Sequence, residues 1–212
     1  MKIKWLGHSC FLFTSGSGVK VLTDPFDSSV GYKVPAVAAD IVTTSHEHFD
    51  HNYTQAVQGE FFHVHETGHV AHKEIEITGI AAFHDGEGGT QRGKNRIYTF
   101  AIDGIHICHC GDLGHGLTPE QLREIGPVDI LLIPVGGFYT IGPAEAVEVI
   151  HSLQPAVTIP MHFKTEAVQL PIGGVEAFLQ QIGGGQRLGK QEVELTKESL
   201  ASMPSVLVLE YK

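Results

Sequence analysis

The sequence Ser45-His46-Glu47-His48-Phe49-Asp50-His51 places three imidazoles and two carboxylates within one short segment. The apolar, β-branched run at 41–44 directly precedes it and predicts a buried strand, so the cluster lies where a strand ends. Alternate residues of an extended segment point to the same side, so His46 and His48 can converge on one metal ion. If the backbone then turns into a helix, Asp50 and His51 point elsewhere and can hold a second ion. Imidazole and carboxylate without thiolate suit zinc, iron, manganese or nickel, which favours a metal site over a solvated polar loop.

The composition is that of a globular protein with an acidic surface. The chain has 212 residues, of which 42% are apolar, and no linker divides it, so we expect a single domain over residues 1–212. Acidic residues outnumber basic ones by 24 to 14, which gives a formal charge of −10. General nucleic-acid binding is therefore not expected, because neutralising phosphates needs a cationic surface. The expected partner is a small-molecule substrate.

The three cysteines, Cys10, Cys108 and Cys110, are an odd and sparse set, which argues against a disulfide scaffold. Cys108 and Cys110 would share one face of a strand, and we expect them to be small buried apolar groups. The N-terminus lacks the apolar run of a signal peptide, and no segment approaches the ~18 consecutive apolar residues of a membrane span. These features predict a cytoplasmic protein without a membrane partner. A homo-oligomer is compatible with the sequence, but only as a general expectation for sheet proteins.

Apolar runs and turn residues predict many strands first, then strands mixed with helices. We expect strands at 3–6, 10–14, 19–23, 41–44, 61–65, 74–78, 80–83, 95–102, 105–110, 129–134, 157–160 and 205–211. Helices are expected from Thr118, whose capping box ends at Gln121, and over 143–153 and 174–182. Asp103-Gly104 predicts a tight hairpin. This order favours a layered α/β sandwich.

Four predicted strand ends carry the same signature, an apolar run followed by His or Asp. The residues are His46 with His48, His84, Asp112 and His162. Strand ends on one side of a sheet sandwich converge, so these side chains can meet in one cleft. Each has a simpler explanation as a turn or core residue, but four such ends along the chain favour a shared metal site.

Several strings resemble the metallo-β-lactamase superfamily over nearly the whole chain. They are Leu6-Gly7-His8-Ser9, the histidine-rich stretch 46–51, 109–115 (HCGDLGH), 133–137 (IPVGG) and 159–162 (IPMH). The strings look like its short metal-dependent hydrolase branch, which is related to the ascorbate-6-phosphate lactonases. The resemblance implies a four-layer αβ/βα sandwich, with two mixed sheets between helix layers.

The resemblance also implies a dinuclear site, most simply with two zinc ions, although manganese, iron or nickel would suit the same ligands. The first ion would be bound by His46, His48 and His84. The second would be bound by Asp50, His51 and His162. Asp112 would bridge ions roughly 3.5–4 Å apart, and water activated between them would attack the substrate. Asp50 would orient that water or protonate the leaving group.

Other polar residues are expected around the ions. Asp24 would brace the ligands from behind, although turn chemistry also explains it. His8, His109 and His115 would be supporting or substrate-contacting residues. The remaining cluster of histidines is expected to lie at the surface or a sheet edge: His63, His65, His69 and His72.

Cations near two of the expected ligands suggest an anionic substrate. Arg92 and Lys94 lie in a Gly-rich loop after His84, and Lys164 follows His162. Solvated surface charge explains them equally well. We expect a hydrolase acting on a small ester, lactone or phosphodiester. The alternatives are a nuclease of the same superfamily, which the acidic balance disfavours, and a non-catalytic metal or ligand sensor.

Overall fold

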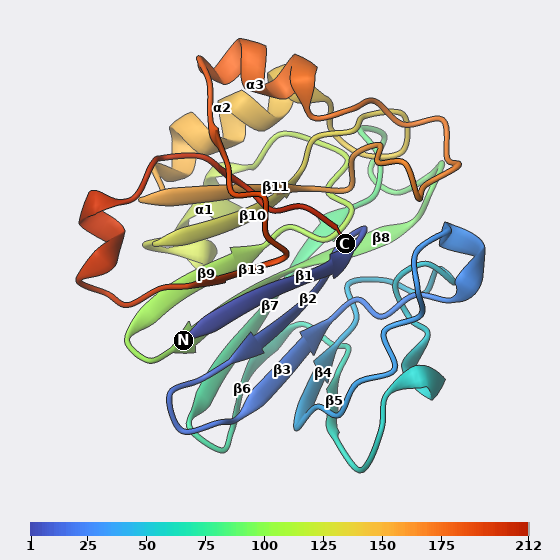
Figure 1. Ribbon diagram of the computed structural model, residues 1–212. Helices are drawn as coiled ribbons and strands as arrows, with labels where there is room; N and C mark the ends of the chain where they lie inside the picture. Colours follow the sequence, from blue (N-terminus) through green and yellow to red (C-terminus); the bar gives the residue numbers. More distant parts are fainter. Residues whose placement is uncertain (212) are drawn as a thin grey trace.

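The computed structural model describes residues 1–211, which form two six-stranded mixed sheets packed face to face (Figure 1). The first sheet has the order β13-β1-β2-β3-β4-β5. Its strands are β1 (Lys2–Gly7), β2 (Cys10–Thr14), β3 (Lys20–Thr23), β4 (Ile41–Thr43), β5 (Phe62–Val64) and β13 (Glu192–Glu194). The pairs β3–β4 and β4–β5 are parallel, and the others are antiparallel.

The second sheet has the order β11-β10-β9-β8-β7-β6. Its strands are β6 (Gly68–His72), β7 (Ile75–Phe83), β8 (Lys94–Ile102), β9 (Ile105–His109), β10 (Ile130–Pro134) and β11 (Val157–Met161). The pairs β9–β10 and β10–β11 are parallel, and β6 to β9 form an antiparallel meander. Asp103 and Gly104 both have positive φ in the β8–β9 hairpin, as the sequence predicted.

The three α-helices cover the outer face of the second sheet (Figure 1). They are α1 (Pro119–Ile125), α2 (Pro143–Leu153) and α3 (Glu176–Ile182). Thr118 and Gln121 form the expected capping box of α1. The outer face of the first sheet is covered mainly by loop residues, with the short 3-10 helices η1 (Ser28–Val30) and η2 (Thr54–Ala56). The expected fold class of two mixed sheets with flanking helices is confirmed.

One continuous set of buried apolar side chains fills the space between the sheets. Trp5, Phe11 and Phe13 of the first sheet pack with Ile77 and Phe100 of the second. Strands alternate their side chains between the two faces of a sheet, so Val21 and Ile41 belong to this inner core, while Leu22 and Val42 belong to a second apolar cluster on the outer face of the first sheet. The core fixes the position of one sheet relative to the other, and this determines which strand ends lie close together.

Some expected elements differ from those observed. The runs 74–78 and 80–83 form the single strand β7, because Gly79 continues the ladder opposite Tyr98. The expected final strand at 205–211 is wrong in extent: only β14 (Leu207–Val208) is a strand, paired with β12 (Gln186–Arg187). Strands β6, β12 and β13 were not expected. Within residues 1–211, no helix is both long and apolar enough to cross a membrane.

Candidate metal centre

The candidate site lies at one end of the sandwich, where strands of both sheets finish. In the first sheet β1, β3 and β4 run in the same direction, as do β7, β9 and β11 in the second. Each of these six strands is followed by a polar segment that reaches the site. In chain order these are His8, Asp24, the stretch 46–51, His84, Asp112 and His162. The four strand ends identified from sequence do converge, and β1 and β3 add two more.

The first donor group consists of His46, His48 and His84, which offer ligand atoms all within 4.8 Å of one another. The His46 ring is oriented by a 3.0 Å hydrogen bond between its Nδ1 and Ser45 Oγ. Its Nε2 is buried and has no hydrogen-bond partner among the described residues. A buried, unpartnered imidazole nitrogen is costly unless something else binds it, which a cation in this group would do.

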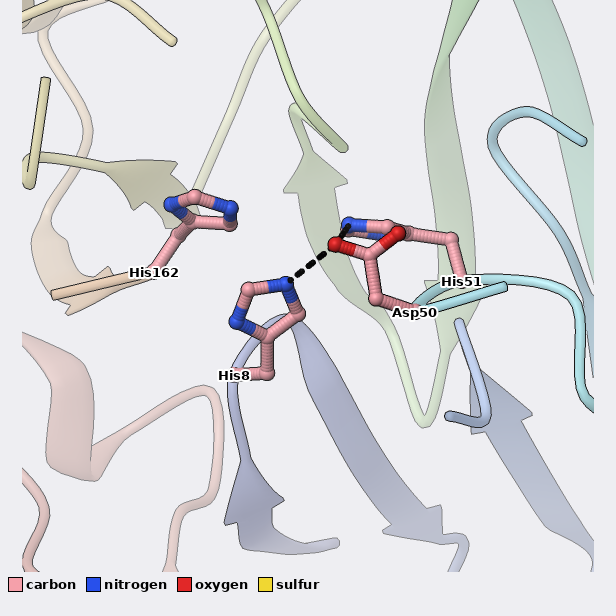
Figure 2. A group of neighbouring side chains, drawn as sticks. All are labelled: His8, Asp50, His51 and His162. Atoms are coloured by element: carbon pink, nitrogen blue, oxygen red, sulfur yellow. Dashed lines mark hydrogen bonds and ion pairs between the residues drawn. The ribbon is translucent and has the colours of Figure 1, made fainter. Parts of the chain in front are cut away.

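The second donor group consists of His8, Asp50, His51 and His162, again with ligand atoms within 4.8 Å of one another. Figure 2 shows these side chains pointing toward one another from separate segments of the chain. His8 Nε2 lies 3.2 Å from Asp50 Oδ2, and His51 Nε2 lies 3.7 Å from the same oxygen. The sequence predicted three of the four together, and the structure adds His8.

Asp112 lies between the two groups. Its Oδ2 is 3.2 Å from Nε2 of His84, in the first group. The same oxygen is 3.2 Å from Nε2 of His51 and 3.3 Å from Nε2 of His162, both in the second. The position is fixed from behind, because Asn95 Oδ1 accepts the Asp112 backbone N–H at 3.0 Å. One carboxylate therefore faces both groups at once.

Asp24 supports the site from the buried side. It accepts hydrogen bonds from the Ser45 backbone N–H at 2.7 Å, from Ser45 Oγ–H at 2.6 Å and from His51 Nδ1–H at 2.9 Å. Because Nδ1–H is donated to Asp24, the nitrogen of His51 that can lose its proton to an ion is Nε2, which faces Asp112. Asp24 itself belongs to none of the donor groups, as expected of a supporting residue.

Burial and the neighbouring charges set the ionisation of the donors. Burial lowers the pKa of His46 well below its usual range, and the His51 charge adds to this effect. Burial would also lower the pKa of His51, but Asp112 and Asp50 raise it well above its usual range. For Asp112, burial acts to raise the pKa, while His162 and His51 bring it well below normal. Without an ion, His46 is therefore a neutral imidazole, whereas His51 is protonated beside the charged Asp112 carboxylate. A divalent cation bound here would displace the Nε2 proton of His51, so metal binding would release a proton.

The donor set itself fits a metal ion. It contains only imidazole nitrogen and carboxylate oxygen. The cysteines Cys10, Cys108 and Cys110 are buried and free, and none belongs to a donor group within residues 1–211. Cys108 and Cys110 are buried, as the sequence predicted, and Cys10 is buried as well.

A cleft of about 340 Å³ opens above the donors. His48, Asp50, His84 and Asp112 are among its lining residues. Its rim carries Phe49, Arg92, Tyr139 and Leu170. A volume of this size is within the range of small-molecule pockets. Sequence reasoning missed the aromatic part of the rim, because single aromatic residues in loops have no distinguishing pattern.

The three expected substrate cations lie in different surroundings. Arg92 lines the cleft, with its guanidinium carbon 5.7 Å from the centre of the Tyr139 ring. Lys94 is exposed at the start of β8, opposite Phe83. Lys164 Nζ donates a 2.9 Å hydrogen bond to the Leu170 carbonyl and is not among the residues that line this cleft. Only Arg92 is placed to meet a molecule in the cleft.

Two of the expected supporting histidines have both ring nitrogens bonded to the protein. His109 donates Nε2–H to the Ser9 carbonyl at 2.8 Å, and its Nδ1 accepts the Gly111 N–H at 3.1 Å. His115 donates to the Gly116 carbonyl and accepts the N–H of Phe83, the residue just before His84. Neither ring has a lone pair left for an ion. The histidines expected outside the site are absent from its donor groups within the described chain: His63, His65, His69 and His72.

Comparison with known proteins agrees with this geometry. A family model described as "Beta-lactamase superfamily domain" matches residues 2–162, which include every donor described above. A UPF0173 metal-dependent hydrolase of Methanopyrus kandleri is 31% identical over 200 residues, covering 78% of this chain and 85% of the relative. Its counterpart from Archaeoglobus fulgidus is 29% identical over 197 residues, covering 78% and 84%. A crystal structure from Thermotoga maritima is also similar; it is described as a candidate Zn-dependent hydrolase of the metallo-β-lactamase superfamily. Its sequence is 40% identical and the TM-score is 0.84, and the match covers 100% of this chain and 99% of the Thermotoga chain.

Proposed function

The chain belongs to the metallo-β-lactamase superfamily and to its UPF0173 metal-dependent hydrolases, and from this premise we propose that it hydrolyses a small ester, lactone or phosphodiester with two divalent metal ions. Zinc is the first candidate, because the Thermotoga maritima relative is described as Zn-dependent. Manganese, iron and nickel suit the same nitrogen and oxygen donors, so metal availability would decide between them.

The observation that carries the proposal is the position of Asp112. Its Oδ2 lies within 3.3 Å of imidazole nitrogens from both donor groups, at His84 on one side and at His51 and His162 on the other. A purely structural site is usually closed by four ligands. Two groups that share a carboxylate and open into a cleft instead support a catalytic centre with two ions.

The ions, when bound, would lower the pKa of a water molecule and polarise the bond to be cleaved. The residues of the chain would do the rest. Asp50, whose side chain is 14% exposed and lines the cleft, would orient the attacking water or pass a proton to the leaving group. Asp24 would hold His51 in the tautomer that keeps its Nε2 toward the centre.

The cleft supports a substrate that carries an anionic group beside an apolar part. Arg92 is half-buried and forms no ion pair with the described residues, so its charge is free to bind a carboxylate or phosphate. Phe49 and Tyr139 offer apolar surface at the same rim. The resemblance to ascorbate-6-phosphate lactonases makes phosphorylated lactones an early choice, alongside carboxylated esters.

The proposal is tested by a hydrolysis screen of lactones, phosphodiesters and thioesters on the metal-loaded wild type and on Asp112→Asn. We expect turnover of at least one class, with a loss in Asp112→Asn of about 100-fold or more, since an amide cannot serve both groups as an anion. Equal activity in the two proteins would sink the shared-carboxylate mechanism.

The hydrolysis screen and a separate RNA-binding experiment address the two alternatives. Bound metal without turnover on any ester would favour a metal or ligand sensor. Binding of single-stranded RNA that weakens steeply with salt would favour a nuclease. The net charge of −10 is evidence against the nuclease. Homo-oligomer formation by this chain is likewise a proposal.

A further inference from the structure

His8 occupies a place in the centre that its expected supporting role does not explain. It follows β1 directly, and its side chain is 1% exposed. In Figure 2 its ring faces Asp50, His51 and His162 across a common space. We propose that His8 is a ligand of the second ion through Nε2, beside those three residues. The assignment rests on the proposed function, which supplies the ion.

Distances support direct ligation. Two donor atoms that bind one ion at about 2.1 Å lie about 3.0 Å apart at a right angle and about 3.4 Å apart at a tetrahedral angle. His8 Nε2 and Asp50 Oδ2 are 3.2 Å apart, inside this range. The rings of His8 and His162 have centroids 4.1 Å apart, and those of His8 and His51 are 4.9 Å apart. The four donors therefore surround one small volume.

The backbone holds His8 in this position. Its carbonyl accepts hydrogen bonds from Trp5 Nε1–H at 2.9 Å and from the His162 backbone N–H at 3.2 Å. Both His8, at φ 52°, and His162, at φ 50°, have the left-handed backbone that residues other than glycine rarely adopt. Such strain persists where the surroundings enforce it, and it is concentrated at functional sites. The two turns are thus built together, and each directs an imidazole into the same group.

A simpler role would be a hydrogen bond from His8 Nε2–H that only positions Asp50. That role needs the two side chains to be adjacent, but it does not need a ring nitrogen of His8 to lie within 4.8 Å of the donors of His51 and His162 as well. His8 also shares a feature with His162: the Nδ1 of each is buried without a hydrogen-bond partner in the described chain, while Nε2 is directed inward. His8 is therefore arranged like an expected ligand.

Ligation by His8 would make the two ions chemically different. The first would have three imidazoles and Asp112. The second would have three imidazoles, Asp50 and Asp112, which is one donor more than a tetrahedral zinc site uses. Such a site suits a divalent ion that accepts more ligands, such as manganese, iron or nickel.

The test is to load metal-free protein, labelled with ¹⁵N at histidine, with ¹¹³Cd²⁺ and to measure scalar couplings between cadmium and imidazole nitrogens. A one-bond coupling requires a direct bond, which a hydrogen bond to Asp50 cannot produce. We expect Nε2 of His8, His51 and His162 to couple to the same cadmium resonance. The His8→Gln variant identifies the His8 signal by removing it, and His63→Gln, outside the donor groups, should leave every coupling in place.

Couplings at His51 and His162 without one at His8 would overturn the inference and leave the proposed function intact. If no histidine couples to cadmium, the proposed function fails, and the assignment of His8 fails with it. Should His8→Gln not fold, the His8 signal is assigned in the wild type by correlation to its own backbone, and the result is equally decisive.

Discussion

At the scale of single residues, Asp24 controls the second donor group without touching an ion. It is fully buried and accepts three hydrogen bonds, two from Ser45 and one from His51. Burial acts to raise the pKa of Asp24, but the hydrogen bond and charge of His51 bring it below the usual value. The carboxylate therefore stays charged and continues to orient His51.

Replacing Asp24 with asparagine should weaken both the fold and the centre. An amide nitrogen cannot accept, so at least one buried donor loses its partner, at a cost of about 1–3 kcal/mol in the free energy of unfolding. Loss of such an outer partner typically reduces metal affinity about 10–100-fold. Denaturant unfolding and competition with a chelator measure the two effects. Glu148→Gln, on the exposed face of α2, is the control, and equal behaviour of the two variants would contradict the role of Asp24.

The sequence indicated a role for residues that lie in a distinctive local pattern, and it said little about isolated residues. The stretch 46–51 indicated a metal site because two pairs of potential donors follow a strand, and the structure places all four in the two donor groups. His8, a lone histidine in its segment, was expected only in a supporting or substrate-contacting role, and its place beside Asp50, His51 and His162 became visible only in the structure. The Lys164 side chain bonds to the Leu170 carbonyl, which depends on how two loop residues fold back and leaves no trace in the sequence.

At the scale of elements, the loop after β7 is organised by one carboxylate. Asp85 Oδ1 accepts the backbone N–H groups of Glu87 at 2.8 Å and Gly89 at 2.9 Å, and Oδ2 accepts those of Gln91 at 3.0 Å and Arg92 at 2.7 Å. Burial acts to raise the pKa of Asp85, but these four N–H groups lower it from 3.8 to about 2. The loop that carries Arg92 to the cleft is thus fixed by an anion.

This loop gives a pH-dependent prediction. A depressed pKa in the folded state means that Asp85 stabilises the protein above its unfolded pKa of 3.8, and that the contribution is lost as pH falls toward about 2. Asp85→Asn should therefore lower Tm at pH 7, and the difference from wild type should shrink between about pH 4 and pH 2. Thermal unfolding across this range measures it, with Glu87→Gln in the same loop as control. A difference that is constant with pH would contradict the account.

Close packing between loops also shapes the first donor group. A Cβ on Gly114 would lie 2.2 Å from the Asp85 backbone nitrogen and 2.3 Å from the His84 carbonyl carbon. Gly114→Ala must therefore shift the segment that carries His84, and overpacking of this kind costs about 1–3 kcal/mol. We expect lower stability and weaker binding of the first ion, measured by denaturant unfolding and metal titration. Gly116→Ala, where the added Cβ meets nothing within 4 Å, should behave as wild type, and a Gly114→Ala protein that also does so would be contrary evidence.

Elements were predictable where one strong local signal defined them. Helix α2 begins and ends as expected, at Pro143 and Leu153, because its apolar stripe and its N-terminal proline agree. Strand β6 was missed because its residues, Gly68–His72, are mostly exposed and carry no alternating pattern. Strand β14 was overestimated because the apolar run 205–211 continues past the two residues that pair with β12. Pairing partners decide such edges, and they are distant in sequence.

At the scale of the whole molecule, the proposal of a single domain is supported by the buried core that both sheets share. Two sheets that share one core should unfold together in one cooperative step. We expect the urea transition of the metal-free protein to coincide when followed by fluorescence of Trp5, the single tryptophan, and by far-ultraviolet circular dichroism. Two separated transitions would show that the sheets unfold independently.

The net negative charge of the chain also bears on the stability of the whole molecule. Five strands of two sheets direct donors to one end of the sandwich, and a sixth, β3, directs Asp24 behind them, in a chain with a net charge of −10. Divalent ions bound there would offset part of that charge and link the two sheets through side chains of both. The centre is therefore expected to contribute to folding as well as to catalysis.

The number of ions that the centre holds is the sharpest measure of whether Asp112 serves two of them. Metal-free protein is titrated with Zn²⁺, freed of unbound metal and subjected to elemental analysis. We expect two zinc ions per chain. A plateau at one ion, or no retained metal, would contradict a centre in which Asp112 serves two ions.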